Sequence, residues 1–335
     1  MRPATILPKR SVKPIAPPPE TPPADASGPR PSAEPSAAAP APGHGLVALS
    51  RLAPRALESR CQTFRKRLKR CRKECSVTAV HQLRVSIRRL LSLLDALEDF
   101  LDAKQVAAAR VQLKKYLSLL SPLRDAQVQL QCLRELLPDF PALEEVCAGL
   151  ARQEKKLARR ARKKLSKVKG AKLNRSLERQ VRRVEKYLQP TTRFPAATRA
   201  MRHAIDRSFR DVVTRRNRVK RPDPAVIHRL RVAFKKFRYL IEALLPALPS
   251  ATQMLRQQMR DCQSVMGHIQ DLDVVVQTIE RAIRKDRKTA LALRPLAEEM
   301  QRRQTDAIAA FLASPADLRA LWSPDYPLQF APPHE

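Results

Sequence analysis

Apolar side chains recur every three or four residues from Leu46 almost to the end of the 335-residue chain. This spacing places them on one face of an amphipathic helix. Pro138, Pro190, Pro222 and Pro246 interrupt the pattern, and proline ends a helix because it lacks a backbone N–H and clashes with the preceding turn. Glycine occurs only 6 times and aromatic residues make up 4% of the chain, a composition that favours helix over sheet. The sequence therefore predicts an all-α fold.

A sequence repeat divides the helical region. Residues 80–89 resemble residues 227–236 at nearly every position, and residues 120–128 resemble residues 266–274. Equivalent positions lie 147 residues apart in the first pair and 146 in the second, so the internal spacing of the repeat is preserved. We therefore predict an internal duplication that gives two pseudo-symmetric four-helix bundles.

The ends of the chain depart from the helical pattern. The N-terminal segment is dominated by Pro, Ala and small polar residues, which bury too little apolar surface to offset the entropy of ordering them, so we predict a disordered tail. No apolar run approaches the about 18 residues that a membrane span needs, so no membrane contact is expected. The predicted parts are the tail at 1–45, the first bundle at 46–190, the second bundle at 194–315 and an irregular C-terminal segment at 316–335.

A line of cations runs along one side of the repeated helix. At about 100° per residue, both copies place a histidine and two cations opposite the apolar face, namely His81, Arg84 and Arg88, then His228, Arg231 and Lys235, and the lines continue to Ser92 and Tyr239. Arginine can hold a phosphate with two hydrogen bonds, and lysine supplies a point charge. Since successive turns rise by about 5.4 Å, such a line suits a linear chain of phosphates. Protonation of the histidines beside phosphate is expected to tighten binding in mild acid.

Net charge points to an anionic partner. Lys and Arg number 66 against 32 Asp and Glu, a formal net charge of +34, which disfavours the folded state unless anions compensate it. Basic clusters at residues 65–73, 155–167 and 215–221 are expected to face solvent and to speed association by long-range attraction, without defining a site.

The six cysteines follow no disulfide-framework spacing, which favours a reducing, cytoplasmic location. Cys71 and Cys75 lie one helical turn apart, with Cys61 and His81 nearby in sequence. Their spacing matches no common zinc module, and the surrounding cations oppose a divalent metal, so no metal site is predicted. Buried thiols on apolar faces are the favoured interpretation.

These motifs resemble the CHAD family, the conserved-histidine α-helical domain, which includes phosin-like proteins. The resemblance covers residues 46–315 and rests on His81-x-Leu-Arg-Val-x-x-Arg-Arg and its second copy from His228 to Glu242. It implies two four-helix bundles whose basic helices face a shared central channel, and it implies non-catalytic binding of inorganic polyphosphate, at polyphosphate granules in some members. Carried over position by position, the implied contacts are His81, Arg84, Arg88, Arg89, His228, Arg231, Lys235, Lys236 and Arg238.

The copies depart from the family pattern. Ser121 stands where the family usually has Gly, Gln127 where it has Asp, and Gln270 where it has Arg. Leu91 stands in the first copy where Arg238 stands in the second, so the halves need not contribute equally. Because carboxylates repel phosphate, the charged residues of the second repeated segment are interpreted as structural, orienting nearby arginines: Arg124, Asp125, Asp271 and Asp273.

Catalysis is not expected from this sequence. It contains no Glu-x-Glu-x-Lys pattern, no phosphate-binding Gly-x-x-x-x-Gly-Lys-Ser/Thr loop and no Gly-x-Gly-x-x-Gly fingerprint, so neither an enzyme nor a cofactor is predicted. The strongest alternative is a nucleic-acid-binding protein that contacts duplex DNA or an RNA backbone, since the sequence pI is about 11.0. Low aromatic content argues against platforms that stack single-stranded bases. A third class, a scaffold protein, would tolerate substitution of the histidine-containing lines.

Overall fold

The computed structural model describes residues 49–168, 170–245, 252–285, 287–313 and 318–322. Within these residues every regular element is a helix, so the predicted all-α fold is confirmed. The predicted tail at 1–45 lies outside the described residues, as does all but residues 318–322 of the predicted C-terminal segment. The elements are α1 (Leu49–Lys73), α2 (Val77–Ala96), η1 (Glu98–Phe100), α3 (Ala103–Leu136), η2 (Pro141–Leu143), α4 (Glu144–Lys167), α5 (Ala171–Leu188), η3 (Thr191–Arg193), α6 (Phe194–Asn217), α7 (Pro224–Leu244), α8 (Thr252–Ile283), α9 (Arg287–Ala313) and η5 (Leu318–Leu321).

Local chemistry explains where the two repeated helices begin. Ser76 precedes α2, and its hydroxyl accepts a hydrogen bond from the Ala79 backbone N–H. Asp223 precedes α7 and accepts hydrogen bonds from the next turn in the same way, while Pro224 occupies the first helical position, where a missing N–H costs nothing. Both copies are therefore capped so that the histidine is the fifth residue of the helix.

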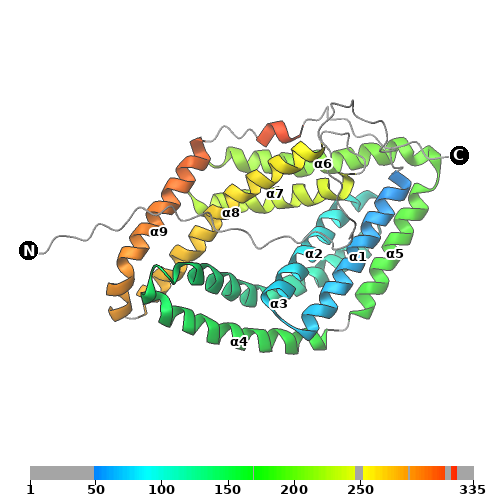
Figure 1. Cartoon of the computed structure of the whole chain (residues 1–335). Helices are drawn as coiled ribbons and strands as arrows, with labels where there is room; N and C mark the ends of the chain where they lie inside the picture. The colour runs from blue at the N-terminus through cyan, green and yellow to red at the C-terminus, as the bar shows by residue number, and fades with distance from the viewer. Residues whose placement is uncertain (1–48, 169, 246–251, 286, 314–317, 323–335) are drawn as a thin grey trace, which may run out of the picture. The chain divides into compact units, whose positions relative to one another are not determined.

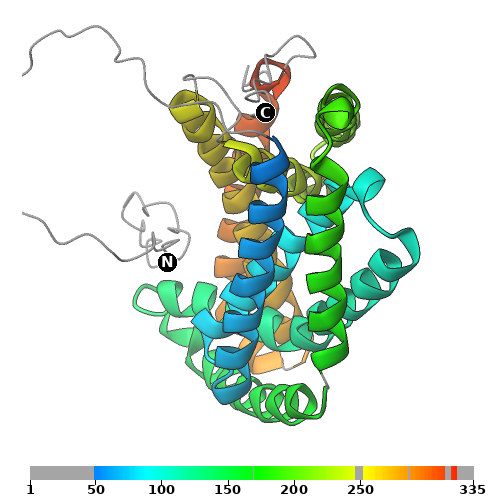
Figure 2. The same cartoon turned by 90° about the vertical axis from the view of Figure 1, so that its right-hand side faces the viewer.

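Helices that follow one another in the chain also pack on one another, as α1 does on α2, α3 on α4, α6 on α7 and α8 on α9. Between the two predicted halves, α2 packs on α7 and α3 packs on α8 (Figure 1). Helix α5 has no counterpart after α9 among the described elements and lies beside α1, as Figure 2 shows. In this part of the chain, no helix is long and apolar enough to cross a membrane.

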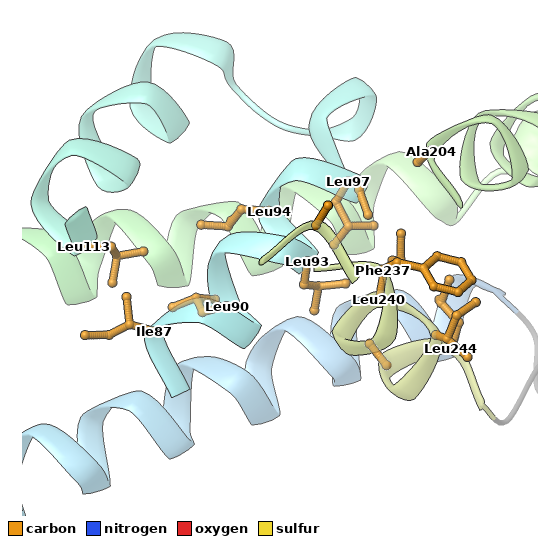
Figure 3. Close-up of a cluster of buried hydrophobic side chains, with 14 of the residues drawn as sticks. Ile87, Leu90, Leu93, Leu94, Leu97, Leu113, Ala204, Phe237, Leu240 and Leu244 are labelled. Atoms are coloured by element: carbon orange, nitrogen blue, oxygen red, sulfur yellow. The ribbon is translucent and has the colours of Figure 1, made fainter. Parts of the chain in front are cut away.

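The apolar faces predicted for the repeated helices are buried. Leu83, Ile87 and Leu90 of α2 are fully buried, as are Phe234 and Phe237 of α7. Figure 3 shows side chains of both helices in one cluster that α6 also joins. The two predicted halves thus share a hydrophobic core.

A second, smaller hydrophobic cluster lies farther along α3 and α8. On α3 the larger cluster ends at Leu123 and the smaller begins at Leu130, and on α8 the corresponding residues are Ile269 and Leu272. The residues between these limits include charged side chains of the second repeated segment. On α3 and α8 a polar layer therefore lies between the two clusters, while Ala307 of α9 packs against both. Hydrogen bonds link this layer to the residue before the N-cap of α2 and to His228 of α7.

Reciprocal ion pairs join α2 to α7. Arg89 Nη2 of α2 lies 3.2 Å from Glu242 Oε2 of α7, and Lys236 Nζ of α7 lies 2.7 Å from Asp95 Oδ2 of α2. Arg89 and Lys236 are 147 residues apart, and so are Asp95 and Glu242. Such reciprocity is what a twofold-related interface shows. It supports the predicted duplication, while the division into two bundles stays a prediction.

The predicted cationic lines are wrong at their C-terminal ends. Ser92 and Tyr239 were expected opposite the apolar faces, but both side chains are buried. The reason is the contact between α2 and α7, which covers both sides of each helix near its C-terminus. The members of the lines that keep exposed surface, among them Arg88 and His228, lie N-terminal to these two residues.

Candidate functional site

Charged side chains from α2, α3, α7 and α8 meet in the polar layer. Burial lowers the pKa values of Arg84, Arg124 and Arg231, and the nearby charge of Arg88 lowers each of them further. We call this set the central cluster, and its members are Arg84, Arg88, Arg124, Asp125, Arg231, Lys235, His268 and Asp271. With histidine neutral, these eight described residues give five positive and two negative charges, a net charge of +3.

Arg84 is fixed in place by α3. Its side chain is buried, with 9% of the residue exposed, and Nη1 donates hydrogen bonds to the Leu117 carbonyl at 2.9 Å and to Ser121 Oγ at 3.0 Å. Burial lowers the pKa of Arg84 to about 10, and the charge of Arg88 adds to this effect. The guanidinium is therefore held where its positive charge is unfavourable without a nearby anion.

Arg231 is held less tightly in the equivalent position. A Cβ added to Gly267 of α8 would lie 3.8 Å from Arg231 Nη2, so the absence of a side chain at Gly267 leaves room beside the guanidinium. The Nε atom of Arg231 is buried and has no hydrogen-bond partner among the described residues. Burial lowers the pKa of Arg231, opposed by the charge of Asp271.

Two further polar atoms of the cluster are buried without a hydrogen-bond partner in the described part of the chain, Arg124 Nη1 and His268 Nδ1. A buried polar atom without a partner costs about 1–3 kcal/mol, and folded proteins rarely leave several close together. Anion oxygens are the acceptors that arginine N–H groups require. The arrangement suits a bound anion.

Asp271 faces the cations of the cluster. Burial raises its pKa, whereas the charges of Arg231, His268, Lys235 and Arg124 act in the opposite direction. A carboxylate so surrounded reduces the repulsion among these cations, and its expected role in orienting the arginines stays a prediction. It also limits the positive charge that a ligand meets.

Comparison with known proteins identifies the family. The model of the CHAD domain matches residues 55–280. The chain belongs to the CHAD family. The CHAD domain from the plant Ricinus communis has a similar fold at 20% identity, with a TM-score of 0.56 over 82% of this chain and 91% of that one. PptA from Streptomyces chartreusis is 18% identical, with a TM-score of 0.57 over 82% of this chain and 99% of that one. No curated protein matches.

Some residues of the repeated CHAD motif lie at the α2–α7 interface. Besides its ion pair with Glu242, Arg89 places its guanidinium carbon 5.4 Å from the centre of the Tyr239 ring. Arg238 is 6% exposed, and its Nε donates to Glu242 Oε1 at 2.7 Å. Lys236 pairs with Asp95. Each of these three cations thus has a carboxylate partner, and the structure does not bring them into the central cluster.

The two motif histidines lie near the N-termini of α2 and α7. His81 is partly buried and His228 is exposed. His228 Nδ1 forms a hydrogen bond with Gln270 Oε1 of α8. Gln270 is 146 residues after Arg124, so the second copy has a histidine partner where the first copy has a cation of the cluster.

Sequence reasoning missed His268 and assigned Arg124 a structural role only. Both lie on long helices whose repeated segments were recognised, but the face that each presents depends on how α3 packs on α8. The sequence signal that could have found His268 is its spacing from Asp271. His268 and Asp271 are three residues apart, which places them on the same face of α8.

Proposed function

We propose that this CHAD protein binds inorganic polyphosphate, without catalysis, at the central cluster. The observation that carries the proposal is the meeting of cations from α2, α3 and α7 with His268 of α8, where Arg124, Arg231 and His268 each have a buried nitrogen without a partner among the described residues. Membership of the CHAD family supports it, because polyphosphate binding is the role that the resemblance implies.

Phosphate binding would relieve the repulsion that the cluster contains. Arg88 is exposed and Lys235 is partly buried, so a phosphate chain can reach them and the inner arginines in turn. Charge-assisted hydrogen bonds to arginine are about twice as strong as neutral ones, and partial burial weakens their screening by salt. In this proposal the cluster lines the shared channel, and the motif histidines lie at its entrances.

A thin chain fits this location better than a duplex. Arg231 and Arg124 are partly buried between helices. A chain without bases can reach these cations, whereas a duplex is too wide for its phosphates to reach them. Nucleic-acid backbones can still contact the exposed cations, so we propose weaker binding of nucleic acid as the second activity. We also propose a cytoplasmic location on polyphosphate granules.

The test is competition between the two polymers. We expect long-chain polyphosphate to bind wild type and to resist displacement by duplex DNA at matched phosphate concentration. The variant Arg88→Ala/Arg231→Ala/Lys235→Ala is expected to lose most of this affinity while it stays folded by circular dichroism. Equal competition by DNA, or undiminished binding by the variant, would contradict the proposal.

The control variant removes the same charge elsewhere. Arg294 and Arg302 are exposed on α9, and Arg284 is exposed directly after α8. Their replacement by alanine lowers the net charge by the same amount, so long-range attraction falls equally. We expect this control to keep near wild-type affinity, which separates a site from general attraction.

A further inference from the structure

The C-terminal half of α4 carries eight cations and no carboxylate. Its cations are all exposed, and none has a carboxylate partner among the described residues. They are Lys155, Lys156, Arg159, Arg160, Arg162, Lys163, Lys164 and Lys167. At a rise of about 1.5 Å per residue they extend over ~18 Å of helix.

Helix α9, which follows α8 as α4 follows α3, carries its charges differently. Arg302 and Arg303 of α9 both pair with Glu299, and Arg302 also pairs with Asp306. A helix face that serves only to keep a protein soluble needs mixed charges, since like charges at a spacing of four residues destabilise a helix. The composition of α4 therefore needs another explanation.

Packing divides the cations of α4 into two flanks. A narrow line that includes Leu150, Ala161 and Leu165 is buried, against α3 and α1. At about 100° per residue, the first flank holds Lys155, Arg159 and Arg162, and the second flank holds Arg160, Lys164 and Lys167. Lys156 and Lys163 lie between the two flanks. Figure 1 shows α4 along the outer side of α3.

The first flank adjoins the N-terminus of α2. The pKa of the Cys75 thiol is lowered, first by its hydrogen bond with Cys71 and then by the charge of Arg162. Cys75 directly precedes Ser76, the residue that caps α2, and His81 follows within the first turns. Arg162 of the first flank therefore lies on the side of α4 that faces the start of α2.

The polar layer of α3 also reaches both elements. Gln127 lies two residues after Asp125 of the central cluster, and its Nε2 donates to Glu154 Oε1 of α4 at 3.2 Å and to the Cys75 carbonyl at 3.3 Å. One amide side chain thus fixes α4 and the entry to α2 relative to the cluster.

We propose that the first flank of α4 is a second binding surface, which holds the continuation of a polyphosphate chain whose other part occupies the central cluster. This inference rests on the proposed function. Two linked sites on one chain raise affinity through effective concentration. The protein would therefore prefer long polyphosphate to chains too short to reach from the cluster to α4.

The experiment compares short and long polyphosphate on three proteins: wild type, the first-flank variant Lys155→Gln/Arg159→Gln/Arg162→Gln, and the matched second-flank control Arg160→Gln/Lys164→Gln/Lys167→Gln. Wild type should bind long chains at least about tenfold more tightly per chain end than short ones. The first-flank variant should lose this preference and keep its affinity for short chains. The second-flank control should retain the preference.

Each other outcome has a defined meaning. Equal loss in both variants would overturn the inference, because it indicates general attraction with no specific flank. An unchanged first-flank variant would overturn it as well. If duplex DNA displaces long chains from wild type by occupying the first flank, the surface is a nucleic-acid site and the inference is wrong. Failure of wild type to bind even short chains would instead contradict the proposed function.

Discussion

Arg84 and Arg231 occupy equivalent positions in the two copies of the motif, yet their surroundings differ. Arg84 donates to Ser121 and to a backbone carbonyl of α3. The residue equivalent to Ser121 is Gly267, and Arg231 Nε beside it has no partner in the described part of the chain. A repeated residue can thus be a structural link in one copy and a candidate ligand contact in the other.

The largest expected effect on binding comes from Arg231. In Arg231→Ala we expect polyphosphate affinity to fall at least tenfold, about 1.4 kcal/mol, because a charge-assisted contact is lost. The free energy of unfolding should change little, since the side chain satisfies few groups of the protein. Titration of labelled polyphosphate and urea unfolding measure the two quantities. A variant that loses stability but keeps its affinity would reverse the assignment.

Arg84→Ala should reduce the stability of the fold more than Arg231→Ala does, and the affinity for polyphosphate less. Loss of the two hydrogen bonds to α3 leaves the Leu117 carbonyl and Ser121 without this donor, and we expect the free energy of unfolding to fall by about 2 kcal/mol. Polyphosphate affinity should fall less than in Arg231→Ala. Urea unfolding of both variants under the same conditions checks the order, and Arg84→Lys serves as a control that keeps the charge.

Gly267→Ser tests whether the missing hydroxyl at position 267 is the reason that Arg231 and Arg84 have different roles. The added Cβ has no contact closer than 3.8 Å, so the change fits, and serine is a better helix former than glycine by a few tenths of a kcal/mol. We expect the new hydroxyl to accept a hydrogen bond from Arg231 and to weaken polyphosphate binding by about threefold, ~0.7 kcal/mol. Tighter binding, or no change together with an unaltered melting temperature, would show that Gly267 does not set the role of Arg231.

Asp271→Asn should have the smallest effect. Burial raises the pKa of Asp271, so the stability this carboxyl contributes is present below its ordinary pKa and is lost as pH rises through the raised value. As pH falls through the same window, its negative charge disappears and polyphosphate should bind more tightly. The variant should bind about threefold more tightly at neutral pH, ~0.7 kcal/mol for a charge ~6 Å away in water. In the variant, polyphosphate affinity should also lose the part of its pH dependence that comes from protonation of Asp271 between neutral and acidic pH. A variant that binds polyphosphate more weakly than wild type would show that Asp271 positions the arginines instead.

Much of the fold was predictable because helical periodicity and capping residues act locally. Leu83, Ile87 and Phe234 are buried as their spacing indicates, and Ser76 and Asp223 cap the repeated helices. Family membership was also predictable, since the paired motifs are specific.

The site was predictable only in part, because its geometry depends on contacts between helices. Arg89, Lys236 and Arg238 carry the same charge as Arg231 in the sequence, and only the packing of α2 on α7 shows that Glu242 and Asp95 face them. Likewise His268 joins the cluster because α8 packs on α3 and α7. A line of cations on one helix cannot reveal which of them meets a carboxylate on another.

The most direct test of the central claim is an NMR titration of arginine side chains with polyphosphate. In protein labelled with nitrogen-15 at arginine, the Nε–H signals of Arg231 and Arg88 should shift on binding, while that of Arg84 should move little because its hydrogen bonds to α3 persist. Shifts confined to arginines outside the central cluster, with the Arg231 signal unchanged, would contradict the account.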